Sequence, residues 1–131
     1  MHSFSVSTSN RSQFIDITGR LQKLVSESKI IEGLCQIWVP HTTAGLTVNE
    51  NADPSVVDDI LRHLDSMVPW DNNYRHGEGN SAAHIKSSLM GCQLSVIISD
   101  GRLQLGTWQG IYFCEFDGPR QRQVRVELIP K

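Results

Sequence analysis

The stretch GLTVNENADPSVVDDILRHLDSMVP, residues 45–69, contains the clearest change from strand to helix in this chain. Residues 46–49 alternate apolar and polar side chains, as a short strand does. Asp53 then stands where a helix N-cap belongs and Pro54 occupies the first helical position. The apolar residues that follow recur at helical spacing and form one stripe: Val56, Val57, Ile60, Leu61, Leu64 and Met67. Pro69 ends this pattern, so we expect an amphipathic helix in front of it.

Upstream of this segment, two alternating stretches predict strands, FSVST at residues 4–8 and QFIDIT at residues 13–18. GRLQKLVSES at residues 19–28 predicts a short helix with Thr18 as its cap. GLCQIWVPHTT at residues 33–43 predicts a further strand that stops near its proline.

Downstream, Asn80 or Ser81 is predicted to cap a second helix that runs through Met90, with Gly91 as its stop. Its apolar residues Ile85 and Leu89 are expected to turn inward.

Four more strands are expected after that helix, and the first two are joined by a hairpin turn at residues 100–101. They are CQLSVIIS (92–99), RLQLG (102–106), GIYFCEFD (110–117) and QVRVELI (123–129). The predicted order is two strands, a helix, two strands, two helices and four strands. Strands that follow one another around grouped helices indicate an α+β fold with a mostly antiparallel sheet. We expect a single compact domain over residues 1–131 with two to three helices.

The composition excludes several classes of protein. The net charge of −2 gives no basic field for nucleic acid, and we interpret the cluster of Arg120, Arg122 and Arg125 as a solvated or interface edge. No apolar run approaches the ~20 residues that a membrane span needs, and no apolar signal core stands at the N-terminus. The three dispersed cysteines argue for buried thiols in a reducing compartment, which makes the cytoplasm the expected location.

Histidines surround a glycine-broken loop in YRHGEGNSAAHIK, residues 74–86. His76 and His84 can converge there, and His41 at the end of its strand is the natural third donor. Three neutral imidazoles with an open position would describe a zinc-like metal site, with Glu78 free to act as acid or base. The alternative is that His41 is a core histidine bonded by a neighbouring threonine, His76 a solvated loop residue and His84 a helix-surface residue.

The start of the second helix offers free backbone N–H groups and small side chains, which suits a phosphate. An ordinary capped helix is the alternative reading of the same residues. The polar residues expected to contact a small phosphorylated metabolite are Thr42, Thr43, Asn49, Asn80, Ser81 and Gln109.

Three long motifs together resemble the YjbQ family, small proteins described as a secondary type of thiamine-phosphate synthase. They are PHTTAGLTVNENADP (40–54), YRHGEGNSAAHIKSSLMG (74–91) and DGRLQLGTWQGIYFCEFDGPR (100–120). The resemblance runs from about residue 4 to residue 129, and Gly45 stands where the family often has a second alanine, which should only loosen the turn. It implies a compact, antiparallel-rich α+β fold, a homotrimer, and weak thiamine-phosphate synthase activity in some members.

The first hypothesis is therefore a transferase that joins a hydroxymethylpyrimidine pyrophosphate to a thiazole phosphate. In it, His41, His76 and His84 hold a divalent metal (Zn or Mg) or a phosphate, and Glu78 and His84 are catalytic. A metal-dependent hydrolase and a non-catalytic trimeric binding protein for a metabolite or metal are the open alternatives.

Assembly is expected from the four C-terminal strands, which carry apolar residues on both faces, as the strand at residues 110–117 illustrates. Ile111 and Phe113 lie on one face and Tyr112 and Phe116 on the other. A strand that is apolar on both faces is buried on both faces. We therefore expect the second face to meet a neighbouring subunit.

Overall fold

The computed structural model describes all 131 residues, and its elements follow the predicted order. The strands are β1 (His2–Ser7), β2 (Gln13–Asp16), β3 (Gly33–Trp38), β4 (Ala44–Glu50), β5 (Gln93–Ser99), β6 (Arg102–Leu103), β7 (Gln109–Glu115) and β8 (Gln121–Pro130). The helices are α1 (Thr18–Ser28), α2 (Pro54–Met67) and α3 (Ser81–Met90). The α+β fold in a single domain, with mostly antiparallel strands and three helices, is confirmed.

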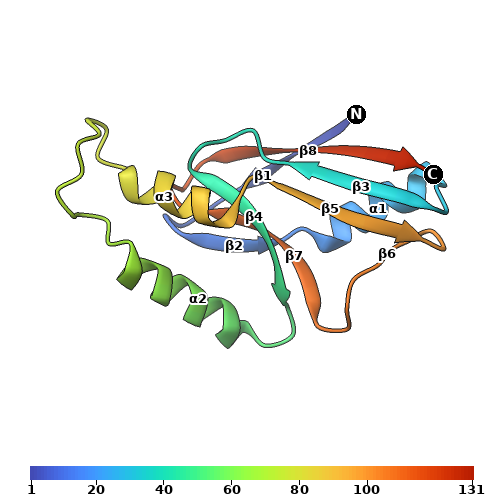
Figure 1. The fold of residues 1–131 in the computed structure, drawn as a ribbon, viewed down its shortest axis with the longest axis horizontal. Helices are drawn as coiled ribbons and strands as arrows, with labels where there is room; N and C mark the ends of the chain where they lie inside the picture. Colours follow the sequence, from blue (N-terminus) through green and yellow to red (C-terminus); the bar gives the residue numbers. More distant parts are fainter.

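Two antiparallel sheets make up the body of the molecule (Figure 1). The larger sheet has the strand order β1-β8-β3-β5-β6, and the smaller one has the order β2-β7-β4. One core cluster joins residues from both sheets and from α1, among them Ile37, Val124, Phe113 and Leu21, which are fully buried. Burial of this apolar surface is the main force that holds the two sheets together.

Strand β7 is buried on both faces, but both faces are covered by this chain itself. Ile111 and Phe113 belong to the core between the sheets. Tyr112 and Phe116 belong to a second cluster with Leu64 of α2 and with residues of α3. The expectation that the second face meets a neighbouring subunit was therefore wrong, because α2 and α3 already occupy it.

The turn and cap chemistry of the sequence is confirmed at two places. The Asp53 side chain accepts a hydrogen bond from the backbone N–H of Ser55 at 2.9 Å, with Pro54 in the first turn of α2. Asp100 and Gly101 both have positive φ, 54° and 74°, in the turn between β5 and β6. Two successive positive φ angles are what a type I′ hairpin turn requires.

Two predicted details of the helices were wrong. Ile17, not Thr18, occupies the N-cap of α1, and the Asp16 carboxylate accepts the Thr18 N–H and hydroxyl instead. On α3 the residues Ile85 and Leu89 point outward, 39% and 53% exposed. The inward positions are taken by small residues and by Lys86, which is buried in an ion pair with Asp65 of α2. The contact with α2 therefore decides which face of α3 is inner.

Gly45 packs inside β4 against the end of α3, so it does not loosen a turn as expected. A Cβ atom at this position would lie 2.5 Å from the carbonyl oxygen of Gly91. The Leu46 N–H also donates to that oxygen, at 3.0 Å. None of the three helices has the length and apolar character needed to cross a membrane.

Candidate functional site

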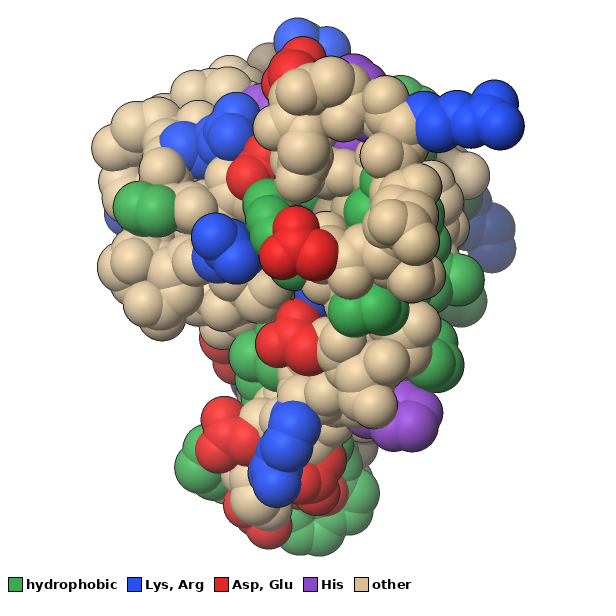
Figure 2. Space-filling view, turned by 90° about the vertical axis from the view of Figure 1, so that its left-hand side faces the viewer, with side chains coloured by type: hydrophobic (Ala, Val, Ile, Leu, Met, Phe, Trp, Pro, Cys, Tyr) green, Lys and Arg blue, Asp and Glu red, His purple; other side chains and the backbone are tan.

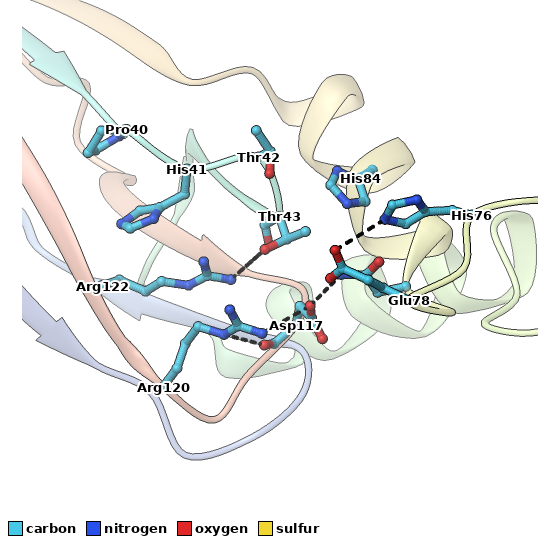
Figure 3. Close-up of a pocket in the computed structure, with 11 residues that line it drawn as sticks. Pro40, His41, Thr42, Thr43, His76, Glu78, His84, Asp117, Arg120 and Arg122 are labelled. Carbon is cyan, nitrogen blue, oxygen red and sulfur yellow. Dashed lines mark hydrogen bonds and ion pairs between the residues drawn. The ribbon is translucent and has the colours of Figure 1, made fainter.

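A polar cavity of about 430 Å³ opens where three connections of the fold meet. They are the β3–β4 connection, the loop before α3 together with the first turn of α3, and the β7–β8 connection (Figure 3). No apolar side chain other than Pro40 lines the cavity. The polar lining residues are His41, Thr42, Thr43, His76, Glu78, Asn80, His84, Asp117, Arg120 and Arg122. Around this end of the molecule, acidic and basic side chains are interspersed and give no field of one sign (Figure 2).

Arg122 is almost completely buried at the cavity wall, and hydrogen bonds hold its guanidinium in one orientation. Its Nε donates to Glu115 Oε1 at 2.8 Å, and its Nη2 donates to Glu115 Oε2 and to Thr43 Oγ1, the latter at 2.8 Å. No hydrogen bond of the structure uses Nη1. The two N–H groups of Nη1 are therefore the donors that this arginine can offer to a ligand.

Glu115, whose carboxylate pairs with Arg122, has no exposed surface. Its carboxylate also accepts the Thr8 hydroxyl at 2.8 Å and the backbone N–H groups of Phe116 and Asp117 at 3.1 Å. Burial alone would raise the pKa of this carboxyl. The hydrogen bonds from Arg122, from the backbone and from Thr8 outweigh burial, and the pKa lies below its usual value. Glu115 is therefore ionised at neutral pH and neutralises Arg122.

His41 is fixed by an unusual partner, the backbone of β8. Its Nε2 accepts the N–H of Gln123 at 2.9 Å, beyond the point where β3 stops pairing with β8. Burial lowers the pKa of this imidazole below its usual 6.5, and the nearby Arg122 acts in the same direction. A neutral imidazole that accepts a hydrogen bond at Nε2 carries its proton at Nδ1, so the hydrogen bond from Gln123 assigns the tautomer of His41. His41 is therefore a hydrogen-bond donor through Nδ1.

The two other histidines lie side by side at the cavity wall. The ring centres of His76 and His84 are 5.3 Å apart and the rings meet edge to face at 88°. Glu78 Oε1 lies 3.8 Å from His76 Nε2, and Figure 3 shows its carboxylate pointing toward that ring. Both His76 and Glu78 are exposed, so both side chains can contact a ligand in the cavity.

Asn80 joins the loop to the β7–β8 connection at the base of the cavity. Its Nδ2 donates to Asp117 Oδ2 at 2.8 Å, and the same oxygen accepts from Arg120 Nη2 at 3.1 Å. Because a carboxylate can only accept, the Asn80 amide must present its nitrogen to Asp117. Its oxygen Oδ1 is buried without a partner, and the side chain does not cap α3. The backbone N–H groups of Ser81 and Ala82 also have no partner.

The three-histidine metal centre expected from His41, His76 and His84 stays a prediction, and the positions of these side chains do not favour it. No group of three histidine, cysteine, aspartate or glutamate side chains is placed to hold a metal ion. The donor chemistry gives a reason: a neutral His41 that accepts the Gln123 N–H has no free lone pair to give to a metal.

The structure brings most of the predicted site residues together. His41, Thr42, Thr43, His76, Glu78, Asn80 and His84 line the polar cavity, and Ser81 lines a groove beside it. Asn49 and Gln109 lie at the opposite end of the β4–β7 pair, whose register runs from Ala44 opposite Glu115 to Glu50 opposite Gln109. There the Asn49 side chain accepts the Glu50 N–H and the Gln109 side chain accepts the Gly106 N–H. Neither residue reaches the cavity.

Sequence reasoning missed Arg120, Arg122, Glu115 and Asp117. The cluster around Arg122 was interpreted as a solvated edge, whereas Arg122 is buried. A signal was present, since Arg122 shares the strand phase of Val124 and Val126, which also face inward. An arginine in the apolar phase of a strand indicates a buried ion pair.

Comparison with known proteins finds one family across the whole chain. The family described as UPF0047 protein YjbQ-like matches residues 2–131. UPF0047 protein MJ1081 of Methanocaldococcus jannaschii is 53% identical over 96% of this chain and 91% of its own length. UPF0047 protein YugU of Bacillus subtilis is 49% identical over 98% of both chains. These descriptions give a family and no activity.

Solved structures agree with that result. The crystal structure of an uncharacterised YjbQ/UPF0047 protein from Clostridium acetobutylicum is similar with a TM-score of 0.97, at 56% identity over 98% of this chain and 100% of that one. A YbjQ-like protein of unknown function from Sulfolobus solfataricus reaches a TM-score of 0.95 at 31% identity, over 99% of this chain and 96% of that one.

Proposed function

The chain belongs to the YjbQ-like UPF0047 family. We propose that it is a transferase of the thiamine-phosphate-synthase type. Its substrates are a hydroxymethylpyrimidine pyrophosphate and a thiazole phosphate, its products are thiamine phosphate and pyrophosphate, and its activity is weak or secondary. The observation that carries the proposal is Arg122, whose free Nη1 lies at a cavity lined by polar side chains and Pro40.

The reaction places its demands on the leaving group. The bond between the pyrimidine methylene carbon and the pyrophosphate oxygen breaks, and its electron pair leaves with the pyrophosphate. The lone pair of the thiazole nitrogen then forms the new carbon–nitrogen bond. A site for this chemistry must stabilise the negative charge that develops on pyrophosphate, and fixed hydrogen-bond donors do so efficiently.

The donors of the cavity suit that task. Arg122 Nη1 and His41 Nδ1 are oriented by bonds that do not involve the ligand. His84 and His76 can hold a proton for the departing oxygen, with Glu78 beside His76. Mg²⁺ enters this proposal only as the counter-ion of the pyrophosphate substrate.

The test is an assay of the purified protein with both precursors and Mg²⁺. We expect thiamine phosphate to form with the wild type and to be lost in His84→Ala and Arg122→Lys. Asn72→Ala, an exposed change in the loop that precedes α3, is the control and should retain the activity. A wild type that forms no more product than His84→Ala would refute the assignment.

A metal-dependent hydrolase finds less support, because its three-histidine ion would need a lone pair that His41 uses for Gln123. Metal analysis of dialysed protein separates the two functions. One tightly held zinc per chain would favour hydrolysis or metal storage over the transferase.

We also propose that the protein assembles as a homotrimer through the outer face of the larger sheet. Leu34 pairs with Ile97 on one side and with Ile129 on the other, so three apolar side chains form one row across β8, β3 and β5. All three are exposed in the single chain, Ile97 to 59%. Such a row suits contact with another copy better than contact with water.

Sedimentation tests this assembly. We expect one species at three times the 14.7 kDa of a chain, and a shift toward the monomer in Ile97→Lys. A wild type that sediments at the monomer mass would contradict the trimer.

The thiols support a reducing environment, and we place the protein in the cytoplasm. All three cysteines are free, and burial raises the pKa of the Cys35 thiol to about 11. Fractionation of cells that express a tagged chain tests the location, and recovery outside the cytoplasmic fraction would contradict it.

A further inference from the structure

A second hollow lies on the other side of the histidine pair. It is an open groove of about 480 Å³ lined by Tyr74, Arg75, His76, Ser81, His84 and Ile85. His76 and His84 also line the polar cavity, so the two imidazoles form the wall between the two spaces. Each of the two imidazoles therefore borders both the polar cavity and the groove.

The groove differs from the polar cavity in its chemistry. Tyr74 offers an aromatic ring whose hydroxyl is tied to the Pro69 carbonyl oxygen at 2.7 Å, so its orientation is fixed. Ile85 offers an apolar surface, because it is exposed on α3. An aromatic ring and a branched aliphatic side chain bind a flat, weakly polar ring well, because most small-molecule pockets are built from such groups.

A phosphate can bind at the same groove. The Arg75 side chain has no hydrogen bond or ion pair within the chain. Ser81 begins α3, and its backbone N–H has no partner. A free guanidinium beside the N-terminus of a ten-residue helix provides charge and donors for one phosphate group.

We propose that this groove is the subsite for the second substrate, a neutral heteroaromatic ring that carries a phosphate. The inference rests on the transferase function proposed above and assigns its second binding site. The ring lies against Tyr74 and Ile85, and its phosphate binds Arg75 and the start of α3. The pyrophosphate substrate occupies the polar cavity.

This arrangement places the reaction at the wall formed by His76 and His84. The ring nitrogen approaches from the groove and donates its lone pair to the methylene carbon. The carbon–oxygen bond breaks toward the polar cavity, and its electron pair leaves with pyrophosphate at Arg122. No covalent enzyme intermediate is needed, and both substrates must be bound at once.

Calorimetry with two separate probes, inorganic pyrophosphate and 4-methyl-5-(2-hydroxyethyl)thiazole phosphate, tests the assignment. Arg75→Ala and Ile85→Asp should weaken binding of the thiazole phosphate by at least about tenfold and leave pyrophosphate binding unchanged, since a hydrogen bond to a charged group contributes about that factor. Arg122→Lys should give the reverse pattern. Leu89→Asp is the matched control for Ile85→Asp, because Leu89 is exposed on the same helix and lies outside the groove.

The outcomes separate the two proposals. The thiazole phosphate should bind equally well to protein saturated with pyrophosphate. If pyrophosphate displaces it, or if Arg75→Ala and Ile85→Asp leave its affinity unchanged, the second subsite is refuted while the transferase function stands. If the thiazole phosphate binds through Arg75 but pyrophosphate does not bind at all, the groove is confirmed and the transferase function is refuted.

Discussion

The Glu115 carboxylate binds the Nε and Nη2 sides of the Arg122 guanidinium and leaves Nη1 facing the polar cavity. The pair is buried, with Glu115 fully enclosed and Arg122 nearly so. One residue thus fixes the direction in which the other can donate.

Glu115→Ala is expected to lower the free energy of unfolding by about 3–5 kcal/mol, because it leaves a charged guanidinium buried without its partner. Urea titration measures this loss. Glu27→Ala removes a solvent-exposed ion pair with Lys23 and serves as the control, with a change within about 0.5 kcal/mol. Equal losses in the two variants would show that the buried pair has no special role.

Stability should also depend on pH below neutrality, through two groups with lowered pKa values. The folded-state pKa of His41 is below its usual 6.5, so its contribution is complete above that pH and is lost as the pH falls through the folded-state value. Glu115 behaves in the same way below its usual 4.5. Both effects therefore reduce stability as acid is added.

His41→Gln separates these two effects, because an amide oxygen can still accept the Gln123 N–H but does not titrate. We expect the first loss, which starts near pH 6.5, to disappear in this variant and the loss at lower pH to remain. Unfolding midpoints measured across this pH range would contradict the assignment if the variant kept the first loss.

The histidine loop should matter for binding and little for stability. The side chains of His76, Glu78 and His84 form no hydrogen bond with the rest of the protein, so alanine at any of them should change the free energy of unfolding by only about 0.5 kcal/mol. Thermal melts with and without pyrophosphate measure both properties. We expect the ligand-dependent rise in Tm to vanish in His84→Ala, and a large loss of stability without ligand would instead assign the loop a structural role.

Gly45→Ala tests the packing between β4 and the end of α3. The added methyl group would lie 2.5 Å from the Gly91 carbonyl oxygen, so the backbone must shift and we expect a loss of about 1–3 kcal/mol. Gly19→Ala, in the first turn of α1, meets nothing within 4 Å and should be neutral or stabilising. Denaturant unfolding of both variants decides, and a Gly45→Ala protein as stable as the wild type would contradict the close approach.

Local signals predicted the elements well because they depend on a few neighbouring residues. Asp53 with Pro54 located the start of α2, and Asp100 with Gly101 located a hairpin. The inner face of α3 could not be predicted in this way. Lys86 is buried only because Asp65, on another helix, pairs with it, and that contact leaves Ile85 outside.

The site could be predicted in part for a related reason. The polar residues of the loop before α3 and of the end of β3 were predicted correctly to share one site. Asn49 was wrongly predicted to belong to it, because β4 runs away from the cavity after Thr43. Arg122 is a buried residue whose charge is balanced by Glu115, seven positions away on another strand. The sequence order alone does not show that these two strands bring the charges together.

Residues 69–79 form no hydrogen bond to any other part of the chain, and Trp70 is attached by packing against the second core cluster and by the stacking of Arg11 on its ring. This segment carries Tyr74, Arg75 and His76, whereas Arg122, Glu115 and His41 belong to the strands and their short connections. Changes within the segment can therefore accumulate without disturbing the sheets. Related chains can evolve a different ring specificity by exchanging this one segment, while the phosphate-binding frame beneath it is inherited intact.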